Sequence, residues 1–242
     1  MTYVNARAVA SLALAMSVYA TAARAQAIVS GNISYFATVD TLSSPRVTTL
    51  NLGQSSSTGL VSQAPVTFQT VEGGTAQVTF SGSSGVYSGN VSGVAAVPQL
   101  GGRPIGNFMA AEPNGAVTVS YSQSQAYFGL NWGSVDRYNS LTFYNNGAQV
   151  ASLSGTQVLA NSSGFYGSTS SNVSINFTNG TTFDQVVARS TSPAFEFGII
   201  QSSRTNVPVP APLPLGSTPI GAIGALLLYL RARSFKIQRA KF

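Results

Sequence analysis

Apolar and polar residues alternate with a period of two in several short stretches of this chain. Val66 and Phe68, for example, alternate with threonine and glutamine. Such alternation predicts half-buried β-strands. Asn-Gly dipeptides allow positive φ at both central positions of a tight turn and therefore favour hairpins. These dipeptides begin at Asn114, Asn146 and Asn179.

The pattern predicts an all-β body. Strands and hairpins are expected at residues 65–80, 115–122, 141–153, 173–183 and 194–200. In the last strand Phe195, Phe197 and Ile199 should face the core and Glu196 the other side. Residues 83–112 are poorly periodic and are expected as a long loop, and no amphipathic helix is expected in the body. We therefore expect a two-sheet antiparallel sandwich, jelly-roll-like.

The N-terminal 25 residues have the features of a signal peptide. A short segment with one cation precedes an alanine-rich apolar stretch, and Ala23-Arg24-Ala25 supplies the small residues of a cleavage site. We expect cleavage after Ala25, with Ala27 as the alternative. Signal peptidase is therefore an expected partner, and the chain is expected to be exported.

The C-terminus has the organisation of a membrane-sorting tail. A Pro-rich linker at 207–212 precedes an uncharged apolar run at 213–230 and a basic end at 231–242. Eighteen residues form a helix of roughly 27 Å, which just reaches across a hydrocarbon core. The cations favour a cytoplasmic end. The alternative is a buried core helix.

The chain's net charge of +6 comes from these two ends. The body, residues 26–206, carries five arginines against all six acidic residues of the chain. The basic balance is therefore no evidence for a nucleic-acid partner. The chain has no cysteine, so its body must be stable without disulfides.

The residue types limit the chemistry. Histidine and cysteine are absent, which excludes a Ser–His–Asp site, a thiol nucleophile and most transition-metal sites. Two of the six acids could form a glycosidase pair, but no spacing brings two together. No calcium-loop motif occurs. We expect no enzyme activity, no cofactor and no metal.

A set of aromatic and polar residues could bind a sugar by stacking and hydrogen bonding. The alternative for Trp132 is the core, because it lies between two glycines in a strand, and Asp136 could cap a turn instead. Tyr144 is out of phase with Leu141 and Phe143 and should be exposed. The candidate ligand residues are Trp132, Asp136, Tyr138, Asn139 and Tyr144.

Two blocks resemble a family of bacterial surface proteins. Residues 126–144 read AYFGLNWGSVDRYNSLTFY, and residues 183–197 read FDQVVARSTSPAFEF. These are similar to two blocks of exosortase-dependent surface proteins, and the tail resembles their C-terminal PEP-CTERM signal. Its sorting motif would be Val207, Pro208, Val209 and Pro210.

The sequence departs from that family at several positions. Val209 stands in place of the glutamate of the Pro-Glu-Pro core, Ala188 replaces a phenylalanine, and Gly198-Ile199 replaces a closing Asp-Asn. The resemblance implies export, a sandwich domain, processing of the tail by an exosortase-type enzyme, and a place in the envelope or exopolysaccharide matrix. We expect a structural or adhesive role. The alternative is a carbohydrate-binding module for extracellular polysaccharide.

Overall fold

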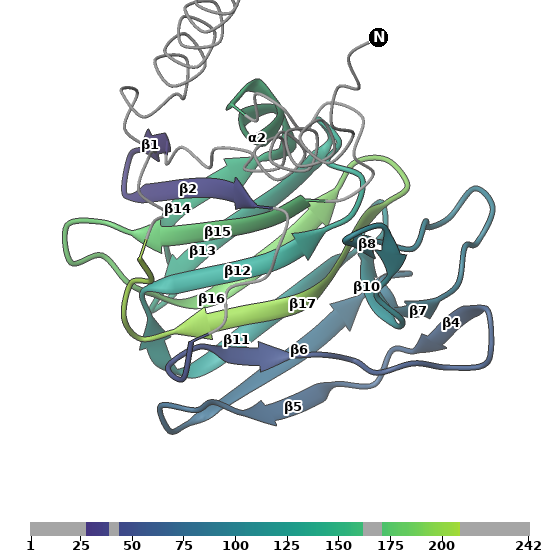
Figure 1. The fold of residues 1–242 in the computed structure, drawn as a ribbon, viewed down its shortest axis with the longest axis horizontal. Helices are drawn as coiled ribbons and strands as arrows, with labels where there is room; N and C mark the ends of the chain where they lie inside the picture. Colours follow the sequence, from purple (N-terminus) through teal and green to yellow (C-terminus); the bar gives the residue numbers. More distant parts are fainter. Residues whose placement is uncertain (1–27, 39–43, 162–170, 209–242) are drawn as a thin grey trace, which may run out of the picture. The chain divides into compact units, whose positions relative to one another are not determined.

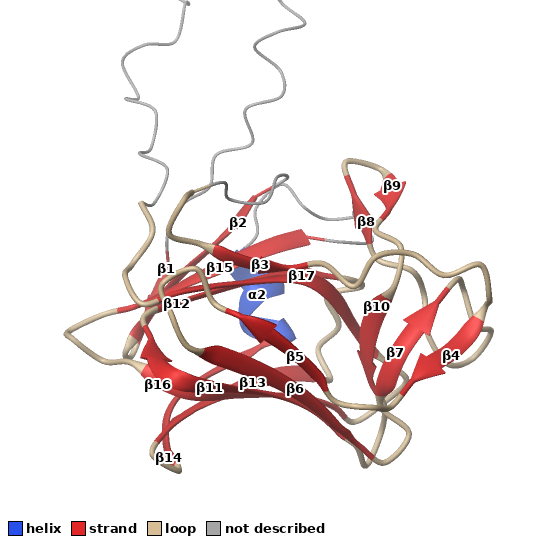
Figure 2. Cartoon of the chain, turned by 90° about the horizontal axis from the view of Figure 1, so that it is seen from below, coloured by secondary structure: helices blue, strands red, loops and turns tan. Residues whose placement is uncertain are grey.

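The computed structural model describes residues 28–38, 44–161 and 171–208, and these residues form antiparallel sheets as in a β-sandwich (Figures 1 and 2). The predicted all-β class is confirmed. The predicted signal peptide and the segment at 213–230 lie outside the described residues. No helix within the described ranges is long and apolar enough to cross a membrane.

The larger sheet, sheet A, has nine strands among the described residues. Eight of them lie in the order β1 (Ile28–Ser30), β2 (Ile33–Thr38), β15 (Ser171–Phe177), β12 (Tyr127–Trp132), β17 (Phe195–Ser203), β10 (Phe108–Ala111), β7 (Gly85–Ser88) and β4 (Gly59–Ser62). The ninth, β3 (Thr48–Leu50), also pairs with β17.

The smaller sheet, sheet B, has six strands in that part of the chain. Their order is β14 (Ala148–Ser154), β13 (Asn139–Asn145), β16 (Phe183–Ser190), β11 (Ala116–Gln125), β6 (Thr75–Ser81) and β5 (Val66–Gln69). Figure 2 shows sheet B as the lower layer. A short ribbon pairs β8 (Gln99–Leu100) with β9 (Arg103–Pro104), and a short helix, α2 (Gly155–Asn161), follows β14.

The core lies between the sheets and is built from the apolar face of each strand. Phe143 and Phe183 of sheet B pack edge-on against Phe128 of sheet A, with ring centroids 5.7 and 6.1 Å from it. Because the chain has no disulfide, burial of these side chains is the main source of stability. The predicted hairpin at 65–80 is confirmed, since β5 pairs with β6 so that Val66 lies opposite Val78 and Phe68 opposite Ala76.

The asparagine of each predicted Asn-Gly turn has positive φ, but Gly115 does not, and two of the three turns do not join neighbouring strands of one sheet. Asn146 and Gly147 both have positive φ and join β13 to β14 in a hairpin. Asn114 and Asn179 also have positive φ, but the turns that they begin lead from sheet A to sheet B. Because each flanking strand buries its apolar face against the opposite layer, these two turns close the sandwich instead of forming hairpins.

Three other expectations were wrong. Residues 83–112 contain β7 to β10, and β10 is buried on both faces, so no alternation could reveal it. The body contains α2, although no helix was expected. Ile199 has a φ of 48°, which shifts the alternation so that Ile200, 1% exposed, faces the core in its place.

Candidate functional site: the cleft over Glu196

The two blocks that carry the family resemblance lie against each other. Trp132 at the end of β12 is the register partner of Phe197 in β17. Asn139 at the start of β13 is the partner of Ser190 in β16. The segments 133–138 and 191–194 therefore meet at one end of the sandwich, where the N–H of Thr191 donates to the carbonyl of Tyr138 at 3.2 Å.

Trp132 is a core residue and cannot stack on a sugar. Its side chain is 0% exposed, and its ring stacks on Phe195 with centroids 4.4 Å apart. Gly133 follows it and lies so close to β17 that a Cβ there would be 2.8 Å from the carbonyl oxygen of Glu196. Proposing Trp132 as a ligand residue was wrong, because β12 lies between two strands and its apolar face is covered by sheet B.

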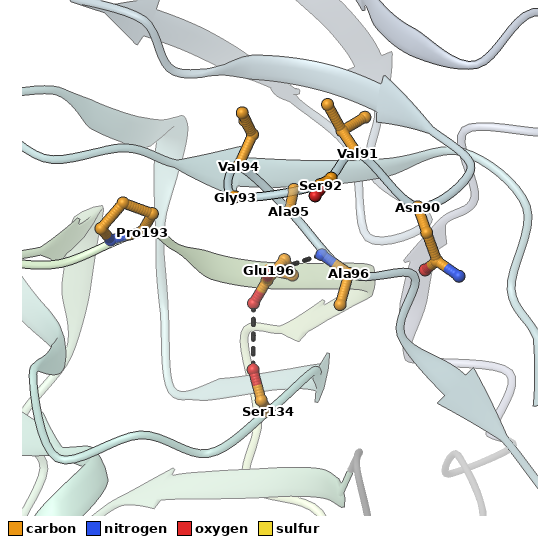
Figure 3. A pocket seen from close by; sticks show the side chains of 10 residues that line it. All are labelled: Asn90, Val91, Ser92, Gly93, Val94, Ala95, Ala96, Ser134, Pro193 and Glu196. Carbon is orange, nitrogen blue, oxygen red and sulfur yellow. Dashed lines mark hydrogen bonds between the residues drawn. The ribbon is translucent and has the colours of Figure 1, made fainter.

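Glu196 lies beneath a cleft of about 600 Å³ (Figure 3). The cleft lies between residues 90–96, Ser134 and Pro193. Glu196 is 3% exposed, and one carboxylate oxygen accepts the N–H of Ala96 at 2.8 Å. The other accepts the Ser134 hydroxyl at 3.2 Å. Both oxygens thus bond within the protein, and the carboxylate fixes the segment that covers it.

Burial raises the pKa of Glu196 above its ordinary value. The hydrogen bonds from Ala96 and Ser134 offset part of that rise, while the nearby charge of Asp136 adds to it. Such a carboxyl takes up a proton more readily than an exposed one.

Glu112 is a second buried carboxyl near this end of sheet A. Ala110 lies opposite Glu196, which places Glu112, two residues further along, on the same face. Its Oε1 atom is buried without a hydrogen-bond partner among the described residues. Burial, and then the charge of Glu196, raise the pKa of Glu112. Glu112 does not line the cleft, so the cleft as described presents one acidic side chain.

Asp136, Tyr138 and Asn139 connect the two blocks. Asn139 is 1% exposed, and its side chain donates to the carbonyl of Ser134 at 3.3 Å and accepts the Ser190 hydroxyl at 2.8 Å. The predicted ligand role of Asn139 is therefore wrong, because its polar atoms are buried and already bonded. The main-chain carbonyl of Asp136 accepts the Asn139 N–H at 3.1 Å, which closes a turn at 136–139.

Tyr138 is half-buried beside the cleft. Its hydroxyl donates to the carbonyl of Pro193 at 3.4 Å. Partial burial, together with the hydrogen bond and charge of Asp136, raises the pKa of the Tyr138 phenol to about 12. The phenol is therefore protonated at neutral pH and serves as a hydrogen-bond donor.

Tyr144 lies elsewhere, in β13 on the outer face of sheet B. Its side chain is partly exposed while Leu141 and Phe143 are buried, as the phase of the strand predicted. The five predicted ligand residues thus do not form one surface. Tyr138 bonds Pro193 at the side of the cleft, and Asp136 lies in the turn before it. Trp132 and Asn139 are buried, and Tyr144 belongs to another face.

Sequence reasoning missed the cleft residues. The one sequence pattern that pointed to a cleft residue was the Phe-Glu-Phe alternation, which showed that Glu196 points away from the core. The residues that cover it, 90–96, come from a segment without periodicity. Ser134 was noticed only as part of a motif, and its bond to a residue 62 positions away could not be inferred locally.

The start of the expected sorting motif is held within the domain. Asn176 in β15 accepts the N–H of Val207 at 2.9 Å and donates to its carbonyl at 2.8 Å. Val207 is 7% exposed and packs with Phe36 and Tyr127, so the domain extends one residue beyond the expected boundary at 206. Pro208 is exposed. Val209, Pro210, Ala23 and Ala25 lie outside the described residues.

No cluster of three or more acidic, histidine or cysteine side chains that could hold a metal ion is found within residues 28–38, 44–161 and 171–208. No family model, curated protein or solved structure matches this chain.

Proposed function

We propose that this chain is an exported cell-surface protein, sorted by its PEP-CTERM-like tail, with a structural or adhesive role in the envelope or exopolysaccharide matrix. Signal peptidase and an exosortase-type enzyme would process its ends, and the segment at 213–230 would hold it in the membrane before processing. A jelly-roll-like arrangement of the two sheets is part of this proposal.

The observation that carries the proposal is that residues of the two motif blocks pack against each other and bond to each other within the fold. Trp132 stacks on Phe195, Gly133 permits the close approach of β17, and Ser134 bonds the carboxylate of Glu196. These contacts hold the end of β12 and the segment after it against β17. Because the cleft's carboxylate is bonded through both oxygens, a structural role explains it better than nucleophilic or general-base catalysis.

The positions of the described chain ends also support a tethered surface domain. Ile28 begins β1 at one edge of sheet A, and Val207 is bonded to Asn176 in β15, the third strand from that edge. Both ends of the described body therefore lie near the β1 edge of sheet A.

The proposal is tested by fractionating bacterial cells that express the full chain or a chain ending at Pro212. The full chain should be recovered with the envelope and start at Gln26 or Ile28 by N-terminal sequencing. The shortened chain should be recovered in the soluble exported fraction. A full chain that stays in the cytoplasm with Met1 in place would refute the proposal, as would a shortened chain that still pellets with membranes.

A second candidate function is binding of extracellular polysaccharide. It is favoured by the outer face of sheet B, which carries Tyr144 among hydroxyl and amide side chains and is uncharged over most of its area.

A further inference from the structure

The outward side chains of sheet B form straight rows across its strands. The register places Tyr144 between Gln149 of β14 and Gln185 of β16. The same row continues through β11, β6 and β5, because each residue has its partner in the next strand. The complete row, from β14 to β5, is Gln149, Tyr144, Gln185, Ser120, Gln77 and Thr67.

A second row lies two residues away along each strand except β14, where a register shift opposite Phe143 and Tyr144 makes the separation three residues. It consists of Ser152, Thr142, Val187, Thr118 and Thr79. Neighbouring strands lie about 4.8 Å apart, so the first row, which crosses six strands, spans roughly 24 Å. We call these two rows the hydroxyl-amide face. Its length suits an extended chain of several sugar rings.

Hydrogen bonds within the first row hold two of its three glutamine amides. Gln185 donates to the Ser120 hydroxyl at 3.3 Å, and Gln77 donates to the Thr67 hydroxyl at 3.5 Å. Ordered side chains lose less conformational entropy when a ligand binds than free ones do. The glutamines occupy alternate strands, so acceptor and donor groups recur about every 10 Å along the row.

The face carries no charged side chain in either row. Arg189 lies on the next row, opposite Ser140, and marks the border of the neutral area. Asp184 also borders the face, but its carboxylate accepts the N–H of Asn146 at 2.8 Å. Without cations the face has no means of attracting a polyanion, and its hydroxyls and amides match the hydroxyls of a neutral sugar.

We propose that the hydroxyl-amide face binds an extended neutral polysaccharide, with the Tyr144 ring against one sugar and the glutamine, serine and threonine side chains bonding its hydroxyls. This inference rests on the proposed surface role and names the ligand class. Many weak contacts in parallel would give an adhesive bond along a polymer, since repeated contacts raise avidity.

The test is native affinity electrophoresis of the full-length chain in gels that contain dextran, xyloglucan or galactomannan, with sodium alginate as the anionic probe. At least one neutral polysaccharide should retard the protein, and alginate should not. Tyr144→Ala should weaken the retardation about tenfold in Kd, as expected for loss of a stacked ring. Tyr144→Phe, which keeps the ring, should stay within about threefold of the parent.

Gln77→Ala removes an exposed amide and should also weaken binding, whereas Gln123→Ala, exposed beyond the rows, should leave it unchanged. Because Gln77 is exposed, this pair remains informative if Tyr144→Ala fails to fold. Three results would each overturn the inference: no retardation by any neutral probe, equal retardation of all variants, or retardation by alginate alone. Envelope recovery of the full chain without polysaccharide binding would refute this inference and leave the surface role intact.

Discussion

Replacing Trp132 tests whether the first motif block is structural. Trp132 is fully buried and stacked on Phe195, so Trp132→Ala should lower the free energy of unfolding by about 3–5 kcal/mol. Trp132→Phe should behave differently. It leaves a smaller cavity, and it removes an indole N–H that is buried without a hydrogen-bond partner among the described residues. Such an unsatisfied donor costs about 1–3 kcal/mol, so the net change should stay within about 1 kcal/mol.

The assay is thermal unfolding of the full chain followed by circular dichroism. For a body of this size 1 kcal/mol corresponds to a Tm shift of about 2–4 °C, so Trp132→Ala should lower Tm by about 6–20 °C. Trp132→Phe should shift it by less than about 4 °C. Trp132 is the only tryptophan, so acrylamide quenching of the parent reports on this one site. Efficient quenching, or an alanine variant whose Tm is unchanged, would refute the reasoning.

Three further expectations concern charge, the chain end and metals. Burial raises the pKa of Glu196, so its contribution to stability is present below the pKa of the unfolded state and is lost as pH rises through the folded pKa. The Tm of Glu196→Gln should therefore rise relative to the parent as the pH is raised above the ordinary carboxyl pKa of 4.5, and a constant difference would contradict this. Asn176→Ala removes both bonds to Val207 and should cost about 1–3 kcal/mol of unfolding free energy in a denaturant titration; no loss would show that the bonds to Val207 are not formed. Millimolar calcium in place of EDTA should leave Tm unchanged, whereas a site at a hundredfold excess of ligand over Kd would raise Tm by about 5–10 °C.

Local patterns predicted the elements whose environment is regular. The hairpins at 65–80 and 141–153 formed as expected, because their alternation matches one buried and one exposed face. The same logic placed Tyr144 outward. It failed at β10, which is covered on both faces, and at Ile199, where a positive φ reverses the phase.

The candidate site was predictable only in part. Trp132, Asp136, Tyr138 and Asn139 do gather near one end of the sandwich, but burial removed Trp132 and Asn139 from any ligand surface. Polarity alone cannot tell a buried, bonded asparagine from an exposed one. The hydroxyl-amide face was invisible for a related reason, since its rows join six strands taken from residues 66–190 of the chain.

The sequence by itself determined the strands with regular alternation, the positive φ of the three turn asparagines and which side of those strands is apolar, because these depend on residues two to four positions apart. Only the tertiary structure decided that two of the three Asn-Gly turns connect the sheets, that residues 90–96 cover Glu196, and that Asn176 holds Val207. The reason is that strand pairing and loop packing are set by which distant apolar faces and polar groups can be buried and bonded together.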